Sequence, residues 1–242
     1  MISVYSLLYK IDLRLNKLAT NDHQAIPVEN KIVSLNSAQD KLIKLRLDEN
    51  NIYHQGLDAF KKRYEDLQHL IEPFHLHPLS LELVDPQLNK WSAQLSNLIP
   101  LYMFYIDSYV LANKGVCRDH TIYVNRDLTK HADITVLLAN NNVNPSFEYQ
   151  ETFCTISSDA YEAYTDGSFN FTNAYISYLR YPVRIDAPGY IHGDGVTSTE
   201  VDCELAAYLE DDIVDLAIQD LAMSTENMAA SQASQQRTQT NE

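Results

Sequence analysis

The sequence predicts an α+β fold: N-terminal helices and a C-terminal helix form a helical core, and a mostly antiparallel β region is inserted between them. Apolar residues recur every three or four positions over residues 2–72 and again over residues 205–223, which is the period of an amphipathic helix. Between these segments lie short runs that alternate apolar and polar residues or are rich in Tyr, Ile and Val, as strands are. Because helical and strand-like segments are segregated along the chain, the pattern favours α+β over alternating α/β.

Three helices are expected in the first part of the chain, over residues 2–18, 27–47 and 57–71. Pro27 suits the first turn of the second helix, and Pro73 closes the third. We interpret their apolar stripes as core. These stripes consist of Val4, Leu8, Ile11, Leu15 and Leu18, then Val28, Ile32, Leu35, Ala38, Leu42 and Leu45, and finally Leu57, Phe60, Tyr64, Leu67 and Ile71.

The middle of the chain is expected to form strands. Residues 161–171 give the clearest hairpin signal, with Asp166 and Gly167 at its tip. The other expected strands are residues 79–83, 100–112, 121–124 and 147–155, together with an aromatic extended run at 178–185.

A loop rich in Gly and Thr leads into the closing helix, which is expected over residues 205–223. We expect this helix to pack against the N-terminal helices. Asp202 is a candidate cap for its start. Leu205, Leu209 and Ile213 recur at helical spacing and begin its apolar stripe, which Leu216 and Ala217 continue. The expected division of the chain is residues 1–72 (helical), 73–186 (β-rich insertion), 187–223 (loop and closing helix) and 224–242 (extended tail).

The tail, residues 224–242, is rich in Ser, Thr, Gln, Asn and Ala and almost uncharged. Such a composition cannot bury enough apolar area to become ordered alone. We therefore expect it to become ordered along a neighbouring chain, where Met228 and the alanines would fill shallow pockets.

Composition bounds the class of protein. The chain has 242 residues, 45% of them hydrophobic and 21% charged, which suffices for a core in one or two domains. Its first residues lack the basic start of a signal peptide, and no apolar run approaches the roughly 20 residues that span a bilayer. The three cysteines are widely spaced, which favours reduced, buried thiols of a protein made in the cytoplasm.

Charge is unevenly placed along the chain. The net charge is −15, yet residues 1–63 hold ten Lys and Arg against seven Asp and Glu, whereas residues 185–236 hold eleven Asp and Glu and neither Lys nor Arg. This distribution argues against nucleic-acid binding by charge. Two interpretations stay open: a solvated acidic face, or an acidic surface that meets a basic one on a partner or on the next copy of this chain.

Few residues suggest chemistry. His75 and His77 would point the same way on a strand, but no third metal ligand is recognisable beside them. Cys117, Asp119 and His120 offer a nucleophile and a base, although neighbours on a strand face opposite sides. A cation site at Asp211, Asp212 and Asp215 is less expected than a plain acidic face, and Gly193-Asp-Gly195 lacks the spacing and the Lys of a phosphate loop. We therefore expect no catalytic, cofactor or metal site.

Sixteen tyrosines indicate either half-buried pleated surfaces or extended contact area with a partner. The second interpretation, together with the acidic helix and the tail, gives a candidate partner interface. Its residues are Tyr178, Arg180, Tyr181, Tyr208, Asp211, Asp212, Asp215 and Met228.

Parts of this pattern resemble a known family. Short N-terminal helices, a long second helix containing Val33-Ser-Leu-Asn-Ser-Ala-Gln-Asp40, a β insertion and an acidic closing helix resemble head–tail connector (adaptor or ring) proteins of tailed bacteriophages. The segments Tyr178-Leu-Arg-Tyr-Pro182, Asp202-Cys-Glu-Leu205 and Tyr208 to Ala217 are similar to ring proteins of crAss-like podoviruses of gut Bacteroidetes. The resemblance covers mainly residues 1–50 and 175–230.

The resemblance implies an architectural role in the neck or tail of a virion, for a protein made in the host cytoplasm. Copies would form a ring, expected to be twelve-fold, beneath the portal protein and beside other tail or ring proteins. DNA would only pass through the lumen, which an acidic surface would suit. Two alternatives remain: an acidic soluble enzyme, such as a hydrolase that uses one of the histidines, and a tail-fibre docking protein.

Overall fold

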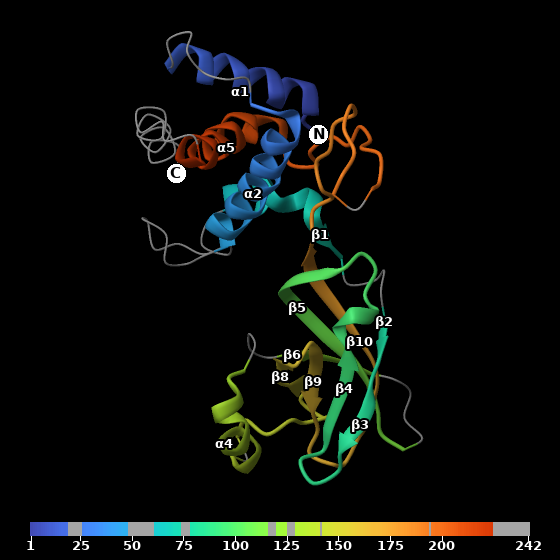
Figure 1. Cartoon of the computed structure of the whole chain (residues 1–242). Coiled ribbons are helices and arrows are strands. Elements are labelled where there is room, and N and C mark those ends of the chain that lie inside the picture. Colours follow the sequence, from blue (N-terminus) through green and yellow to red (C-terminus); the bar gives the residue numbers. More distant parts are fainter. Residues whose placement is uncertain are drawn as a thin grey trace. The chain divides into compact units, whose positions relative to one another are not determined.

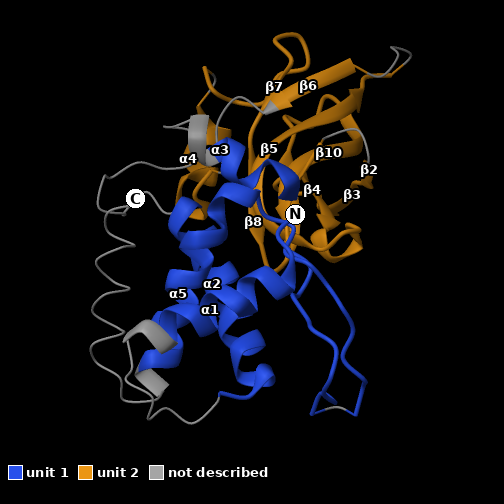
Figure 2. Cartoon of the chain, turned by 90° about the horizontal axis from the view of Figure 1, so that it is seen from above, with its two compact units in different colours: residues 1–70, 182–242 blue, residues 71–181 orange. Residues whose placement is uncertain are grey.

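A computed structural model describes residues 1–18, 26–47, 61–73, 78–115, 120–124, 129–140, 142–193 and 195–224. Two compact units divide the chain, one formed by residues 1–70 and 182–242 and the other by residues 71–181 (Figure 2). The first, which we call the helical unit, is assembled from both ends of the chain; the second, the β unit, is continuous in sequence. Helices near both ends and a sheet-rich middle confirm the expected α+β fold.

In the helical unit, α1 (Val4–Leu18) and α2 (Val28–Leu47) both pack against α5 (Glu210–Ser224) (Figure 1). A short α3 (Lys61–Leu67) continues into a 3-10 turn, Gln68–Leu70. α5 is the central helix, because its buried residues surround it instead of forming one stripe. The buried apolar side chains of the three long helices are Val4, Leu7, Ile11, Ile32, Leu35, Ala38, Leu42, Ile43, Ile213, Val214, Leu216, Ala217, Ile218, Leu221 and Ala222.

Several expected helix details are wrong. Leu7, not Leu8, is fully buried on α1, and Val28 at the start of α2 is exposed. The closing helix begins at Glu210, because Ala206 is extended and residues 207–209 form a 3-10 turn. The third helix ends at Leu67, and residues 57–60 of its expected stripe lie outside the described residues.

The segment that follows the β unit is held by side chains instead of by a sheet. The expected extended run at 178–185 is a strand only to Arg180. Beyond it, Asn36 of α2 accepts a hydrogen bond from the Ile185 amide and donates one to the Ile185 carbonyl, both at 2.9 Å. Asp202 does not cap α5: its carboxylate accepts the Val4 amide at 2.9 Å and so caps α1. A backbone bridge between Ile2 and Cys203 completes this attachment of the two chain ends.

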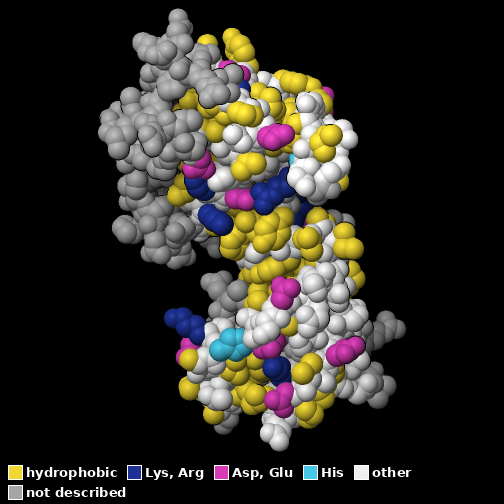
Figure 3. All heavy atoms as spheres, viewed as in Figure 1, with side chains coloured by type: hydrophobic (Ala, Val, Ile, Leu, Met, Phe, Trp, Pro, Cys, Tyr) yellow, Lys and Arg dark blue, Asp and Glu magenta, His cyan; other side chains and the backbone are white. Residues whose placement is uncertain are grey.

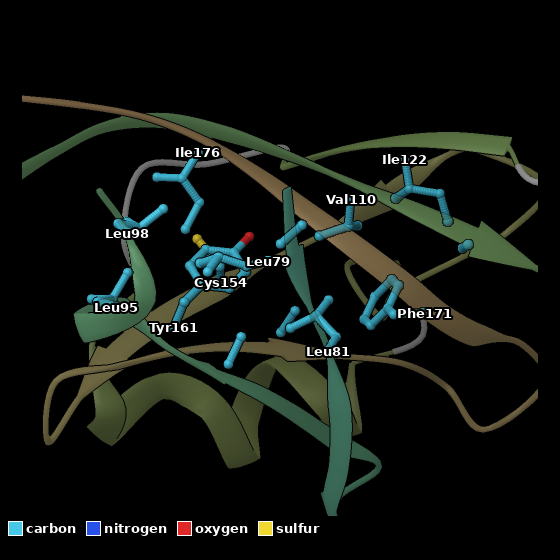
Figure 4. Close-up of a cluster of buried hydrophobic side chains, with 14 of the residues drawn as sticks. Leu79, Leu81, Leu95, Leu98, Val110, Ile122, Cys154, Tyr161, Phe171 and Ile176 are labelled. Carbon is cyan, nitrogen blue, oxygen red and sulfur yellow. The ribbon is translucent and has the colours of Figure 1, made fainter. Parts of the chain in front are cut away.

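The β unit consists of two sheets that pack around one core (Figure 4). Strands of the first sheet follow the order β1-β10-β5-β6-β7, with β2 also beside β10, and those of the second follow β3-β4-β9-β8; every pair is antiparallel except β6 with β7. A short α4 (Ile134–Ala139) adds a second, small cluster with Phe153 and Tyr164. The strands are β1 (Ile71–Glu72), β2 (Pro78–Ser80), β3 (Glu82–Asp85), β4 (Lys90–Gln94), β5 (Tyr102–Asn113), β6 (His120–Val124), β7 (Glu151–Thr152), β8 (Cys154–Ser157), β9 (Ala160–Tyr164) and β10 (Asn170–Arg180).

Three expected strand assignments are corrected by this topology. The predicted hairpin at 161–171 is not a hairpin: β9 pairs with β4 and β8, β10 pairs with β1, β2 and β5, and the turn at Gly167 crosses between the sheets. The expected strand at 79–83 is split in the same way between β2 and β3, and residues 147–155 divide into a turn, β7 and β8. Alternation reveals which side chains face a core, but it does not identify the partner strand.

A polar group of side chains is buried between the two sheets. The Ser108 hydroxyl lies 2.8 Å from the Tyr105 hydroxyl and 2.9 Å from that of Tyr161, and the Cys154 thiol lies 3.6 Å from Tyr105. Burial raises the pKa of Cys154 and of both tyrosines, so all remain neutral at pH 7. Cys154 and Cys203 are free and buried, as expected of reduced thiols, whereas Cys117 lies outside the described residues.

Candidate functional site: surfaces of the helical unit

The acidic residues of α5 face basic residues of α1 inside the helical unit. The Lys10 ammonium lies 2.8 Å from Glu210 and 3.0 Å from Asp211. Arg14 reaches Asp211 at 2.8 Å and the buried Asp215 at 2.5 Å. Three acidic residues of α5 are therefore matched by basic side chains of α1 within one chain. The interpretation of an acidic surface reserved for a partner is wrong for these three residues, while Asp211 still exposes 56% of its side chain to solvent.

A second ion-pair group is more deeply buried and joins α2, α3 and α5. Arg46 is 5% exposed, with its Nε 3.0 Å from Asp66 and its Nη2 3.2 Å from Asp212. Asp66 is 1% exposed and also accepts a 2.6 Å hydrogen bond from the Tyr208 hydroxyl. Burial and this hydrogen bond raise the pKa of Tyr208 to about 12, so its hydroxyl remains a donor at neutral pH.

These contacts show which of the candidate interface residues lie on the surface and which are buried or paired within the chain. Tyr178 is fully buried in the β unit, with its hydroxyl 2.7 Å from the Pro100 carbonyl, so it does not lie on the surface. Arg180 pairs with Glu72 at 3.2 Å, and Asp211, Asp212 and Asp215 pair with basic side chains of the helical unit. Tyr181 and the ring of Tyr208 are exposed, and Met228 lies outside the described residues.

One face of α1 is apolar and exposed. Tyr5, Tyr9 and Leu13 recur every four residues on the side of the helix opposite Leu7 and Ile11, and Tyr9 is 68% exposed. We call these three residues the α1 ridge. Figure 3 shows apolar side chains exposed among the charged side chains of the helical unit. An apolar face of this kind is a feature of interaction sites.

A groove with a cavity volume of about 480 Å³ lies between the first turns of α2 and the segment 184–201. Its rim is apolar, since Val33 is 69% and Ile191 is 64% exposed. We call this site the α2 groove. Its lining residues are Glu29, Ile32, Val33, Asn36, Arg184, Ile185, Asp186, Tyr190, Ile191, His192, Gly193 and Val201.

Asp186 organises one wall of the α2 groove. Its carboxylate accepts hydrogen bonds from the Tyr190 hydroxyl at 2.6 Å and from the Thr199 amide at 2.8 Å, and His192 Nε2 lies 3.1 Å away. Burial would raise the pKa of Asp186, but these hydrogen bonds outweigh it and lower that pKa. An Asp–His pair can act as a general base. Among the described residues, however, His192 contacts Asp186 and the ring of Tyr190, and neither contact is with a Ser or Cys nucleophile. The pair shapes the groove wall.

The other weighed residues do not assemble a metal or catalytic site in the described part of the chain. His75, His77, Cys117 and Asp119 lie outside it, and His120 on β6 contacts the ring of Phe147. No group of three or more His, Cys, Asp or Glu among the described residues could hold a metal ion. None of the helices described is both long and apolar enough to cross a membrane.

We expect the helical unit to lose stability as the pH falls through the carboxylate range. A hydrogen bond from Lys10 lowers the pKa of Asp211 from its ordinary 3.8. Burial would raise the pKa of Glu210, but hydrogen bonds from Lys10 and Ser6 lower it from 4.5. A folded-state pKa below the unfolded value gives stabilisation that is complete above pH 4.5 and is lost at lower pH.

The measurement is the melting temperature between pH 7 and pH 3, followed by circular dichroism at 222 nm. Lys10→Met is the matched variant, because it removes the donor shared by both carboxylates without changing them. Its melting temperature should fall less steeply below pH 4.5 than that of the unchanged chain. Parallel curves for the two proteins would contradict the assignment.

No protein-family model matches the chain, and no curated protein compared with it is similar in sequence. The protein can therefore be classified by its fold alone: it is an α+β chain with one helical unit and one unit of two packed sheets. A second apolar repeat in α1 could have indicated its ridge from the sequence. The α2 groove had no such signal, because residues some 150 positions apart form it.

Proposed function

We propose that this chain is a structural subunit of a tailed-phage virion, a ring or adaptor protein that joins the portal to the tail and surrounds the DNA exit channel. Its partners are copies of itself, expected to be twelve, the portal protein and other tail or ring proteins. The proposal places the protein in the neck or tail of the virion, after synthesis in the host cytoplasm. No catalysis is part of this role.

The α1 ridge is the observation that carries the proposal. α1 buries Leu7 and Ile11 in its own unit, yet it presents Tyr5, Tyr9 and Leu13 to solvent on the other side. A helix that is apolar on two opposite faces is suited to bury the second face in an assembly. The resemblance of residues 1–50 and 175–230 to head–tail connector proteins supports the same role.

The ion pairs of α5 change one part of the expected role. Glu210, Asp211 and Asp215 contact Lys10 and Arg14, so these carboxylates are not counted as the acidic lining of a channel. With a net charge of −15, the chain still carries acidic residues elsewhere, and a surface of that sign would not retain the phosphate backbone of DNA.

Light scattering during size-exclusion chromatography and negative-stain imaging of the purified chain test the proposal. We expect a mass that is a multiple of 27.6 kDa and ring-shaped particles with a central channel. A single species of 27.6 kDa at every protein concentration would contradict it.

A further inference from the structure

We propose that neighbouring copies of this chain associate head to tail, with the α1 ridge of one copy seated in the α2 groove of the next. The inference rests on the proposed ring and names the two surfaces that would form its subunit contact. The occupant of the groove is thus a second copy of the chain, and the anchor is Tyr9.

The other sides of α1 have partners within the helical unit. Val4, Leu7 and Ile11 are buried in the core. Lys10 and Arg14 contact α5 on one flank, and Asp12 pairs with Lys31 of α2 on the other. The ridge is the remaining side, and it carries two aromatic rings and a leucine. The Tyr5 hydroxyl donates a hydrogen bond to Glu200 at 3.3 Å, so the ring of Tyr9 is the freer of the two aromatic side chains.

The α2 groove matches the ridge in size and chemistry. A volume of about 480 Å³ lies within the range of roughly 300–1,000 Å³ that accepts a drug-sized ligand, so it can receive an aromatic ring with an aliphatic neighbour. Ile32, Val33 and Ile191 provide apolar wall, and the exposed Glu29 carboxylate offers an acceptor for the Tyr9 hydroxyl. An aromatic anchor in a pocket is the usual centre of a protein interface.

The geometry of the two surfaces decides the kind of symmetry. The ridge lies on α1, whereas the groove lies between α2 and segment 184–201, so the contact joins two different surfaces. Repeated contacts between different surfaces close into a ring or continue as a filament. A fully buried aromatic side chain contributes on the order of 150–250 Å², against about 800 Å² per partner in a standard interface. The ridge would therefore anchor a larger contact.

Two single variants of the full chain test the inference. Tyr9→Asp disrupts the ridge and Val33→Asp disrupts the groove; both residues are about equally exposed, so both variants should fold. Each variant alone should lower the self-association constant, measured by sedimentation velocity, at least tenfold. Val84→Asp changes an exposed valine of the β unit and should assemble like the unchanged chain.

Mixing the two variants distinguishes a head-to-tail contact from a two-fold one. The groove variant keeps its ridge, and the ridge variant keeps its groove, so an equal mixture should form one intact junction. The expected product is a complex of two chains, twice 27.6 kDa, that grows no further. A two-fold contact between ridges would instead let the groove variant, which keeps its ridge, form dimers without the ridge variant.

The outcomes separate this inference from the proposed function. If the unchanged chain forms rings and both variants also form them, the contact lies elsewhere and the inference is overturned while the ring stands. A mixture that remains monomeric overturns the inference as well. If the unchanged chain forms no ring at any concentration, the proposed function itself is contradicted.

Discussion

Replacing Leu35 by Asp is expected to unfold the helical unit. Leu35 is fully buried on α2, the helix that packs against α5. The substitution loses about 1.5–3 kcal/mol of apolar burial and places a carboxylate where its desolvation costs several kcal/mol more. Folded domains have a total stability of about 5–15 kcal/mol, so most of the margin disappears. Circular dichroism at 222 nm should show loss of the cooperative helical transition.

Asn30→Asp is the matched control for this prediction. Asn30 lies on the same helix, is exposed and does not line the α2 groove, so the new charge stays in water. Surface changes of this kind usually alter stability by less than about 0.5 kcal/mol. Equal melting temperatures for both variants and the unchanged chain would show that α2 does not bury the face containing Leu35.

Replacing Arg46 by Met is expected to destabilise the helical unit by about 3–5 kcal/mol, because it leaves a buried carboxylate without its cation. Among the described contacts, Asp66 would keep the hydrogen bond from Tyr208 alone, and Asp212 would lose its contact with the guanidinium. The measurement is the free energy of unfolding from urea titrations. Arg184→Met is the control, because Arg184 is exposed and its pair with Asp40 should contribute only about 0–1 kcal/mol.

The double variant Arg46→Met, Asp66→Leu tests the cause of that loss. Removing both also removes the most deeply buried charge, that of Asp66. Asp212, whose side chain is 17% exposed, still loses its contact with the guanidinium, so stability should recover part of what the single variant lost. The Tyr208 hydroxyl would then turn to solvent, because its ring is exposed. If the double variant is less stable than Arg46→Met, the buried charge is not the cause of the loss.

The α+β class and the second helix could be predicted from the sequence because they depend on local periodicity. The stripe of Ile32, Leu35, Ala38 and Leu42 fits one helical face, and the same residues are buried. The first residue of α5 could not be predicted from this periodicity. Leu205 and Leu209 follow helical spacing and are both buried, but the chain reaches those buried positions through an extended residue and a 3-10 turn.

Long-range pairing could not be predicted in this way. The Asp166-Gly167 turn has hairpin chemistry, but the same residues serve a crossing between two sheets, and a single sequence gives no information about β10's pairing with β5. The charges illustrate the same limit. The basic and acidic segments were evident, but only the fold reveals that Lys10 and Arg14 contact residues some 200 positions away. The Asp186 hydrogen bonds and the α2 groove likewise depend on tertiary contacts.

The discontinuity of the helical unit has a consequence for biosynthesis. α1 and α2 leave the ribosome before the whole β unit, whereas α5, their central partner, comes more than 160 residues after the end of α2. At a synthesis rate of about 5–20 residues per second, the apolar faces of α1 and α2 remain without α5 for about 10–30 s. The β unit is continuous and can fold during that interval. Of the two units, the one whose synthesis begins first is thus completed last, and chaperones have that interval in which to protect its unfinished core.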